Sequence, residues 1–566
     1  MEPITHITST NHIINMKNNC SHRTSFTSFL FALSIIGSMG AIGCSDGDDS
    51  GTIAAEQVET VKQFFDEDHD GVTNDIDMCV STPTDESADQ DGCSVSQLDV
   101  DTWVAGEFAP ASDFKALCVS PRSGTNPATG LPYPDEAGTV LDENNWLRSW
   151  SNDLYLWYDE IVDRDPADYT TPEYFDLLKT FATTPSGNLR DRFHFTMDTA
   201  EWRALSQGGV STGYGATFVI IQGTPPRQIV VAYTEPDSSA TTDPANLARG
   251  ATLLEIDGVD VIDGTDVDTL NAGLFPSEPD ESHDFVVQDL GSAVTRSFTM
   301  VSEAATSVPV QHTGTIDTAS GTVGYMLFNA HIATAEQLLV DAVNQLKTAG
   351  VTDLVLDLRY NGGGFLDIAN ELAYMIAGPG PTTGQTFEAL QFNDKHTTVN
   401  PVSGELLTPS LFYNTTRGIS APQGVALPSL DLTRVYILTG WGTCSASESI
   451  INGLRGVDIE VIQIGSTTCG KPYGFYLFEN CGTTYFSINF RGVNAKGFGD
   501  YTDGFSAENT DPIEGTPIPG CSVADDYTHA LGDPAERRLA AALAYRTDGT
   551  CPEASGISQQ VRSGSA

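Results

Sequence analysis

Basic residues are scarce in this 566-residue chain. It has 27 lysines and arginines against 76 aspartates and glutamates, which gives a formal net charge of −49. Proteins that bind nucleic acids neutralise phosphates with lysine and arginine, so this composition argues against a nucleic-acid partner. The hydrophobic fraction of 40% is ordinary, and a chain of this length is expected to form about three to five domains.

A long uncharged run occurs near the N-terminus, at residues 24–43, and it is only marginally long enough to cross a membrane. It follows Lys17 and Arg23, and small residues lead from it into Cys44. This pattern is typical of an export signal and resembles a bacterial lipobox, in which Cys44 is acylated. We therefore expect a lipoprotein signal peptide over residues 1–43, a tether over 44–60, and a lipid anchor in the cell envelope, with Ser45 favouring the outer membrane. A simple membrane-spanning anchor is the alternative.

The chain has ten cysteines. Loss of Cys20 with the signal peptide and of Cys44 to lipid leaves an even number, as expected in an oxidising compartment. Two disulfides are predicted, Cys79–Cys93 and Cys521–Cys551. The pairing of the other four stays open: Cys118, Cys444, Cys469 and Cys481.

An acidic segment over residues 66–77 has the spacing of a calcium loop, with oxygen ligands on alternate residues and Gly71 at the sharp turn. The segment resembles a thrombospondin type 3 repeat, over residues 61–100. The alternative is a solvated acidic linker. The candidate Ca²⁺ ligands are Asp66, Asp68, Asp70, the carbonyl of Val72, Asn74 and Asp77.

A serine and a lysine each follow an apolar run that is typical of a buried strand. Ser445 comes after residues 435–440 and begins a predicted helix, and Lys471 comes after residues 459–465. A serine hydroxyl is a weak nucleophile unless a base takes its proton. A lysine can be that base only when it is neutral, so it must be shielded from water or near another cation. The alternative for Ser445 is a helix N-cap without chemistry.

A triple-glycine turn, residues 362–364, follows another predicted strand and precedes a predicted helix over 365–377. Glycines permit positive φ and close backbone approach, so this turn can direct N–H groups at a substrate carbonyl. The alternative is a tight strand–helix turn.

Together, the motifs Asp357–Gly364, Ser445–Glu448 and Gly470–Lys471 resemble the S41 peptidases, the C-terminal processing proteases, over roughly residues 140–550. The resemblance implies that Ser445 is the nucleophile, Lys471 the base and Glu448 a supporting polar residue. It also implies that the oxyanion donors are the N–H groups of Ala446 and of a glycine, Gly362 or Gly363.

Two features depart from that family's pattern. The separation of Ser445 and Lys471 is one residue longer than usual, and Phe475 stands where many relatives have a glutamine, so we expect Glu448 to orient the lysine. Cys444 is an alternative nucleophile, but no histidine lies near it in the sequence. A Ser-His-Asp esterase is disfavoured because no Gly-x-Ser-x-Gly motif surrounds Ser445.

Residues 206–308 are predicted to form short strands and resemble a PDZ domain. In that interpretation, a glycine-containing loop binds a peptide carboxylate through N–H groups, and the peptide adds to the sheet as a strand. The alternative is a small β-domain that only packs. The candidate peptide-binding residues are Gly213, Tyr214, Gly215 and Ala216.

The predicted fold class is multidomain α+β: an α/β S41 (crotonase/ClpP-like) protease core over 309–550, a small helical N-terminal domain over 101–205, the β-rich PDZ-like domain over 206–308, and a disordered tail over 551–566. Helices are expected over 335–349, ended by Gly350, and from an Asp533 cap, with Pro534 and Glu536 in its first turn, to Tyr545.

The predicted function is a lipid-anchored serine endopeptidase that cuts polypeptides near their C-termini, with no cofactor for catalysis and Ca²⁺ in residues 66–77. The alternative is a non-catalytic lipoprotein that binds peptide or an apolar ligand on the same fold.

Overall fold

The computed structural model describes residue 72 and residues 103–552. The account below concerns residues 108–552, which belong to one compact unit. The signal peptide, Cys44, the Cys79–Cys93 pair and the acidic segment, except Val72, lie outside the described residues, so those predictions stay predictions. No helix in the described part is both long and apolar enough to cross a bilayer.

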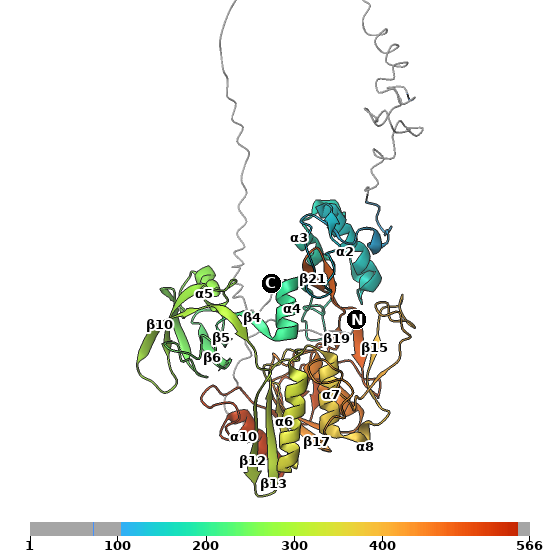
Figure 1. Cartoon of the computed structure of the whole chain (residues 1–566). Coiled ribbons are helices and arrows are strands. Elements are labelled where there is room, and N and C mark those ends of the chain that lie inside the picture. Colours follow the sequence, from blue (N-terminus) through green and yellow to red (C-terminus); the bar gives the residue numbers. More distant parts are fainter. Residues whose placement is uncertain (1–71, 73–102, 553–566) are drawn as a thin grey trace, which may run out of the picture. The chain divides into compact units, whose positions relative to one another are not determined.

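A six-stranded sheet forms the centre of the predicted core (Figure 1). Its strand order is β12-β13-β14-β17-β18-β25, in which β12 and β13 are antiparallel and the other neighbours are parallel. Parallel strands covered on both faces are apolar almost throughout. The bounds are Val310–Thr318 for β12, Gly321–Phe328 for β13, Asp353–Asp357 for β14, Arg434–Thr439 for β17, Glu460–Gly465 for β18 and Gly520–Ser522 for β25.

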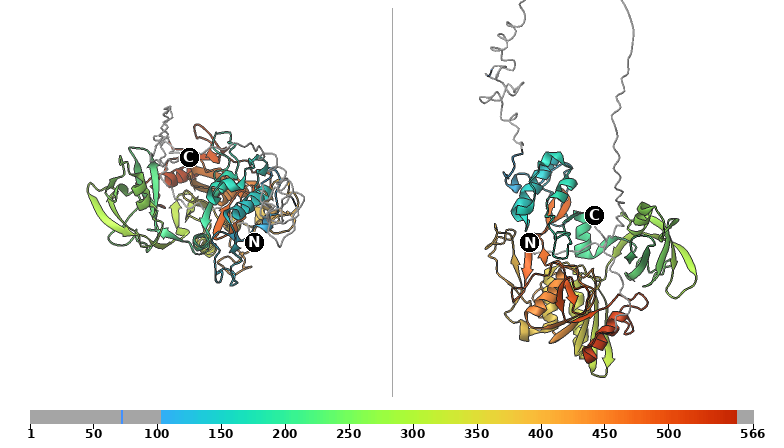
Figure 2. Two further views of the ribbon diagram at one scale, coloured as in Figure 1. Left: turned by 90° about the horizontal axis from the view of Figure 1, so that it is seen from above. Right: turned by 180° about the vertical axis from the view of Figure 1, so that it is seen from behind.

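Helices cover both faces of this sheet. Successive residues of a strand point to opposite faces, so one strand can contribute to the apolar clusters on both sides. Helices α6 (Ala335–Ala349), α7 (Leu366–Ala377) and α9 (Ala446–Gly456) share one core cluster with Met326, whereas α10 (Arg537–Asp548) shares another with Leu327. Figures 1 and 2 show α10 (red) across the sheet from α6 and α7 (yellow). The predicted α/β core is therefore confirmed.

The predicted helix over 335–349 is confirmed, and Gly350 ends it in a left-handed conformation with φ of 68°. The predicted start of the last helix at Asp533 is wrong. Asp533 instead closes a local turn by accepting the N–H of Ala535, and the helix begins at Arg537. Glu536 is its N-cap, because its carboxylate accepts the N–H of Leu539 at 3.0 Å. The helix ends at Asp548 rather than at Tyr545.

The N-terminal region contains the expected helices, but it is joined to the core. Trp146 and Trp150 stack within it at 5.3 Å between ring centroids. Strand β3 pairs with β21 of the core, and a disulfide joins Cys118 to Cys481. The bounds are α2 Val140–Leu154, α3 Thr171–Leu177, β3 Phe195–Asp198, α4 Thr199–Arg203, β1 Leu117–Cys118, β2 Glu136–Ala137, the 3-10 helices η1 Ala111–Asp113, η2 Tyr158–Glu160 and η3 Pro166–Asp168, and the π-helix η4 Ala204–Gly208.

The predicted PDZ-like region is a separate β-rich sheet with its own apolar cluster. Its strand order is β10-β9-β7-β6-β5, with β8 beside β7, so β5 lies at an edge. The bounds are β4 Val210–Gly213, β5 Ala216–Gln222, β6 Gln228–Thr234, β7 Thr252–Ile256, β8 Val259–Asp260, α5 Val267–Leu274, β9 Ser282–Gln288, β10 Thr295–Val301 and β11 Glu303–Thr306, where β11 pairs with β4.

Shorter elements complete the core around the main sheet. They are α8 Pro379–Thr382, β15 Thr386–Gln391, β16 Ser410–Leu411, β19 Tyr473–Gly474, β20 Phe478–Asn480, β21 Thr483–Phe486, β22 Phe490–Val493, β23 Phe505–Ala507 and β24 Thr516–Ile518. The predicted disulfide Cys521–Cys551 is confirmed.

Candidate active site

Four strand ends place the candidate residues together. Asn329 follows β13, the triple-glycine turn follows β14, Ser445 follows β17 and Lys471 follows β18. These strands are parallel neighbours, so their carboxyl ends meet at one edge of the sheet. That edge is where α/β folds bind ligands.

Ser445 occupies the N-cap position of α9 in a capping-box arrangement with Glu448, and Glu448 accepts the N–H of Ser445, but the Ser445 hydroxyl itself makes no hydrogen bond with a described residue. The side-chain oxygen, Oγ, is buried and finds no hydrogen-bond partner among the described residues. Its backbone has φ of 55° and ψ of −117°, which is strained for a residue other than glycine, and such strain clusters at functional sites. The N-cap alternative therefore accounts for the position of Ser445 but not for its unpartnered oxygen.

The triple-glycine turn lies directly against Ser445. A Cβ atom on Gly363, which has φ of 99°, would lie 2.9 Å from the nitrogen of Ala446, so only glycine fits there. The N–H of Gly363 donates to the side chain of Asn361 at 3.0 Å. In the described part of the chain, the N–H groups of Gly362 and Ala446 donate to no protein atom, so these two remain available to an oxyanion.

Asn361 connects three parts of the site. Its amide oxygen also accepts from His331 at 2.9 Å, and its amide nitrogen donates to the carbonyl of Phe328 at the end of β13. Its backbone carbonyl accepts the N–H of Cys444 and the hydroxyl of Ser447. One buried asparagine thus fixes the glycine turn relative to the start of α9.

Glu448 holds the Ser445 turn and the Lys471 loop together. Its carboxylate accepts the backbone N–H of Ser445 at 3.0 Å and that of Lys471 at 2.8 Å. Gly470 and Thr468 donate to it as well. Burial raises the pKa of Glu448, and these four hydrogen bonds oppose that shift. Glu448 therefore positions the backbone of Lys471, whereas the sequence led us to expect an effect on the lysine side chain.

A disulfide joins the same two segments. Cys444, directly before Ser445, is bonded to Cys469, two residues before Lys471, with 5.1 Å between the Cα atoms. This pairing fills in the connectivity that the sequence left open. It also removes Cys444 as a nucleophile, because a disulfide sulfur carries no thiol. The two sulfurs and the Glu448 carboxylate lie close enough to hold a metal ion, but a cysteine binds a metal as its thiolate, and neither sulfur of a disulfide is one.

Lys471 is buried among aromatic rings. Its ammonium nitrogen, Nζ, lies 4.1 Å from the ring centroid of Phe475 and 5.0 Å from that of Phe193. No described residue accepts a hydrogen bond from Nζ. Burial lowers the pKa of Lys471 well below its usual value, although the carboxylates of Asp191 and Glu448 act in the opposite direction. The site therefore favours a neutral amine, the form that can accept a proton.

Two of these neighbours were missed from the sequence. Phe193 and Asp191 lie in the segment just before β3, far from Lys471 along the chain. Asp191 is buried and accepts hydrogen bonds from the hydroxyl of Tyr155 and the N–H of Phe193. Neither residue belongs to a recognisable motif, so only the fold reveals their place.

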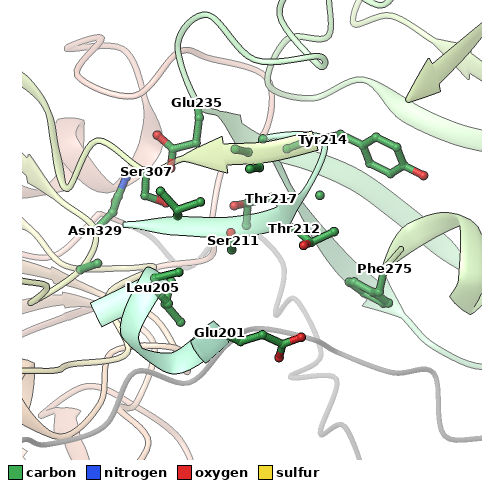
Figure 3. A pocket seen from close by; sticks show the side chains of 18 of the residues that line it. Glu201, Leu205, Ser211, Thr212, Tyr214, Thr217, Glu235, Phe275, Ser307 and Asn329 are labelled. Carbon is green, nitrogen blue, oxygen red and sulfur yellow. The ribbon is translucent and has the colours of Figure 1, made fainter. Parts of the chain in front are cut away.

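A cavity of about 470 Å³ connects the predicted peptide-binding loop to the glycine turn (Figure 3). Its wall includes all four predicted peptide-binding residues, Gly213–Ala216, and also Gly362 and Gly363. No lysine, arginine or histidine is among the described side chains that line it. The sequence missed two polar groups in this wall, Asn329 and Glu235.

Comparison with known proteins finds one family match, and it lies within the core. Residues 322–476 match the sequence profile of Peptidase family S41. No curated protein matches the chain significantly. A crystal structure from Bacteroides fragilis, described as that of an S41 protease, is 21% identical to this chain with a TM-score of 0.54. The match covers 74% of this chain and 100% of that one.

Two further solved structures show weaker similarity. The photosystem II D1 C-terminal processing protease is 19% identical with a TM-score of 0.37, covering 64% of this chain and 90% of its own. Mature CPAF in complex with lactacystin is 12% identical with a TM-score of 0.36, covering 67% and 93%.

Proposed function

We propose that this chain, whose residues 322–476 match Peptidase family S41, is a serine peptidase that cuts polypeptides with a Ser445–Lys471 dyad. Lys471 takes the proton of the Ser445 hydroxyl while Oγ attacks the scissile carbonyl. The N–H groups of Ala446 and Gly362 stabilise the resulting oxyanion. Lys471 then gives the proton to the leaving amine of the substrate. In the second step the neutral amine of Lys471 takes a proton from water, and this water attacks the acyl group and releases it from Ser445.

One observation carries this proposal: the hydroxyl of Ser445 and the amine of Lys471 are both buried and both without a hydrogen-bond partner among the described residues. Burying a polar group without a partner costs about 1–3 kcal/mol. Two such groups, on segments that Glu448 and the Cys444–Cys469 disulfide hold together, therefore indicate a function. They do not bond to each other in this structure. Catalytic hydrogen bonds often tighten only when substrate is bound.

The test is proteolysis of an unstructured polypeptide by the purified mature protein. Mass spectrometry of the products identifies the cleaved bonds, and the Ser445→Ala variant serves as the control. We expect discrete fragments with the natural protein and none with the variant. Binding of the polypeptide without turnover, unchanged in the variant, would instead support a non-catalytic binding protein.

We further propose that the PDZ-like region selects substrates by their free C-termini. The Gly213–Ala216 loop leads directly into the edge strand β5, which offers unpaired backbone groups to an added peptide strand. The cavity that begins there reaches the glycine turn. A substrate bound by its C-terminus is thereby directed to Ser445.

Two further proposals rest on the sequence alone: attachment to the cell envelope through Cys44, and calcium binding by residues 66–77. Acylation of Cys44 is supported by the lipobox-like run before it, and mass spectrometry of the membrane fraction tests it through the lipid-modified N-terminal peptide. Calcium binding by residues 66–77 is supported by their ligand spacing. Calorimetry with Ca²⁺ on the full mature chain tests it, and the absence of heat would make this segment a charged linker.

A further inference from the structure

Asn329 is a buried polar residue that the dyad does not use. It comes directly after β13, at the sheet edge that carries the glycine turn, and the residue is only 7% exposed. The backbone N–H of Asn329 donates to the carbonyl of Pro309 at 2.8 Å, which fixes the main chain. Both amide atoms of the side chain, Oδ1 and Nδ2, have no hydrogen-bond partner among the described residues.

The side chain of Asn329 lines the cavity that connects the Gly213–Ala216 loop to Gly362 and Gly363. Figure 3 shows it in this wall with Ser307 and Glu235. Glu235 is already satisfied, because its carboxylate accepts the N–H of Val308 at 2.9 Å and the amide of Gln311 at 2.7 Å. Among the described residues that line this wall, Asn329 is therefore the polar side chain that is both deeply buried and unpartnered.

An unpaired amide in this position matches one kind of ligand. An asparagine side chain offers one acceptor oxygen and two donor hydrogens. A peptide main chain offers a C=O and an N–H from each residue, so one asparagine can bind both. The cavity carries no cationic side chain among its described lining residues, so its ligand is recognised by neutral hydrogen bonding at this point.

We propose that Asn329 binds the main chain of the substrate between the scissile bond and the C-terminus. This inference rests on the proposed function, in which the glycine turn binds the scissile carbonyl and the Gly213–Ala216 loop binds the terminal carboxylate. The part of the substrate between those two points passes Asn329. The residue holds the leaving-group side of the substrate in register with Ser445 and is a positioning residue, not part of the dyad.

The test uses the nearly isosteric Asn329→Leu variant and two substrates. One is a peptide that extends beyond the scissile bond to a free C-terminus, and the other ends at the scissile bond with a chromogenic amine. We expect kcat/KM to fall about tenfold for the long substrate, the loss of one or two hydrogen bonds, and to stay unchanged for the short one. The melting temperature should stay equal or rise, because an unpaired buried amide is removed.

Asn494 supplies the matched control. It is equally buried, but its amide donates to Asn452 and accepts from Lys496 and Phe498. Asn494→Leu should lower the melting temperature and leave the ratio of kcat/KM for the two substrates unchanged. An equal loss for both substrates in Asn329→Leu, or no loss for either, would overturn the inference.

A binding measurement separates this inference from the proposed function. In a Ser445→Ala background, calorimetry with the long peptide should show an affinity that Asn329→Leu weakens about tenfold. If the natural protein cleaves no substrate while this difference is seen, the dyad mechanism fails and the Asn329 site stands. If the affinities are equal, the Asn329 site fails whatever the activity.

Discussion

Arg359 and Lys471 are both buried cations of the same core, and their surroundings are opposite. Arg359 is fully enclosed and pairs with the carboxylates of Asp357, Asp525 and Glu536, at 2.7–2.9 Å. Lys471 is equally enclosed, but the rings of Phe475 and Phe193 lie beside its amine and no acceptor in the described part of the chain reaches it. A buried charge persists only when it is paired. Arg359 therefore stays charged and has a structural role, whereas the surroundings of Lys471 favour its neutral form.

The largest effect is expected from removing the dyad. Ser445→Ala and Lys471→Ala should each lower kcat by about 10²–10⁴ or more, because a nucleophile and its base act as a unit. Circular dichroism and the melting temperature should stay those of the natural protein. Near-normal turnover by Lys471→Ala would show that another group takes the proton of Ser445.

A second test removes Arg359, the paired cation. Arg359→Met leaves the buried carboxylates of Asp357 and Glu536 without their cation, while Asp525 keeps its ion pair with Arg249. The free energy of unfolding should fall by about 3–5 kcal/mol. Lys471→Met, the matched control, should leave it equal or raise it, because an unpaired buried amine is replaced by an apolar chain. Denaturant titration measures both. Equal destabilisation by the two variants would mean that Lys471 is also paired.

A third test concerns the disulfide that joins the Ser445 turn to the Lys471 loop. Replacing Cys444 and Cys469 together by serine should lower kcat about ten- to hundredfold, since small displacements of catalytic groups cost that much. KM should change little, because the peptide cavity does not include these residues. The same double replacement of Cys521 and Cys551 is the control, and it should lower stability without lowering kcat. Equal kcat losses would show that neither disulfide positions the dyad.

The smallest expected effect concerns the PDZ-like region. Substrates with a free, apolar C-terminus should be cut about tenfold faster than the same peptides amidated there, since amidation removes the charge that backbone N–H groups bind. Competition between the two forms in one reaction, followed by mass spectrometry, gives the ratio directly. A ratio near one would leave a general endopeptidase with an accessory β-domain.

The sequence predicted the parts of the site that adjoin regular elements. Ser445, Lys471 and the glycine turn each follow an apolar strand, and strand ends in an α/β core meet at one edge. The helix over 335–349 was predicted to the residue, because its stripe of apolar residues and its final glycine are local signals.

Other features depend on partners distant in sequence. The aromatic wall of Lys471 includes Phe193, which no motif marks. The last helix begins later than its local signals suggest, where Glu536 caps it while also pairing with Arg359. The pairing of Cys444 with Cys469 is one of several combinations that counting allows. Asn329 is inconspicuous until the cavity beside it is known.

The pH dependence of kcat/KM tests the central claim most directly. Burial lowers the pKa of Lys471, and only the neutral amine can accept the proton of Ser445, so the rate should rise as the pH rises. The rise should pass through an apparent pKa below that of an ordinary lysine, about 10.4, and then level off. A rate that is flat between about pH 6 and pH 10 would contradict a titrating lysine base.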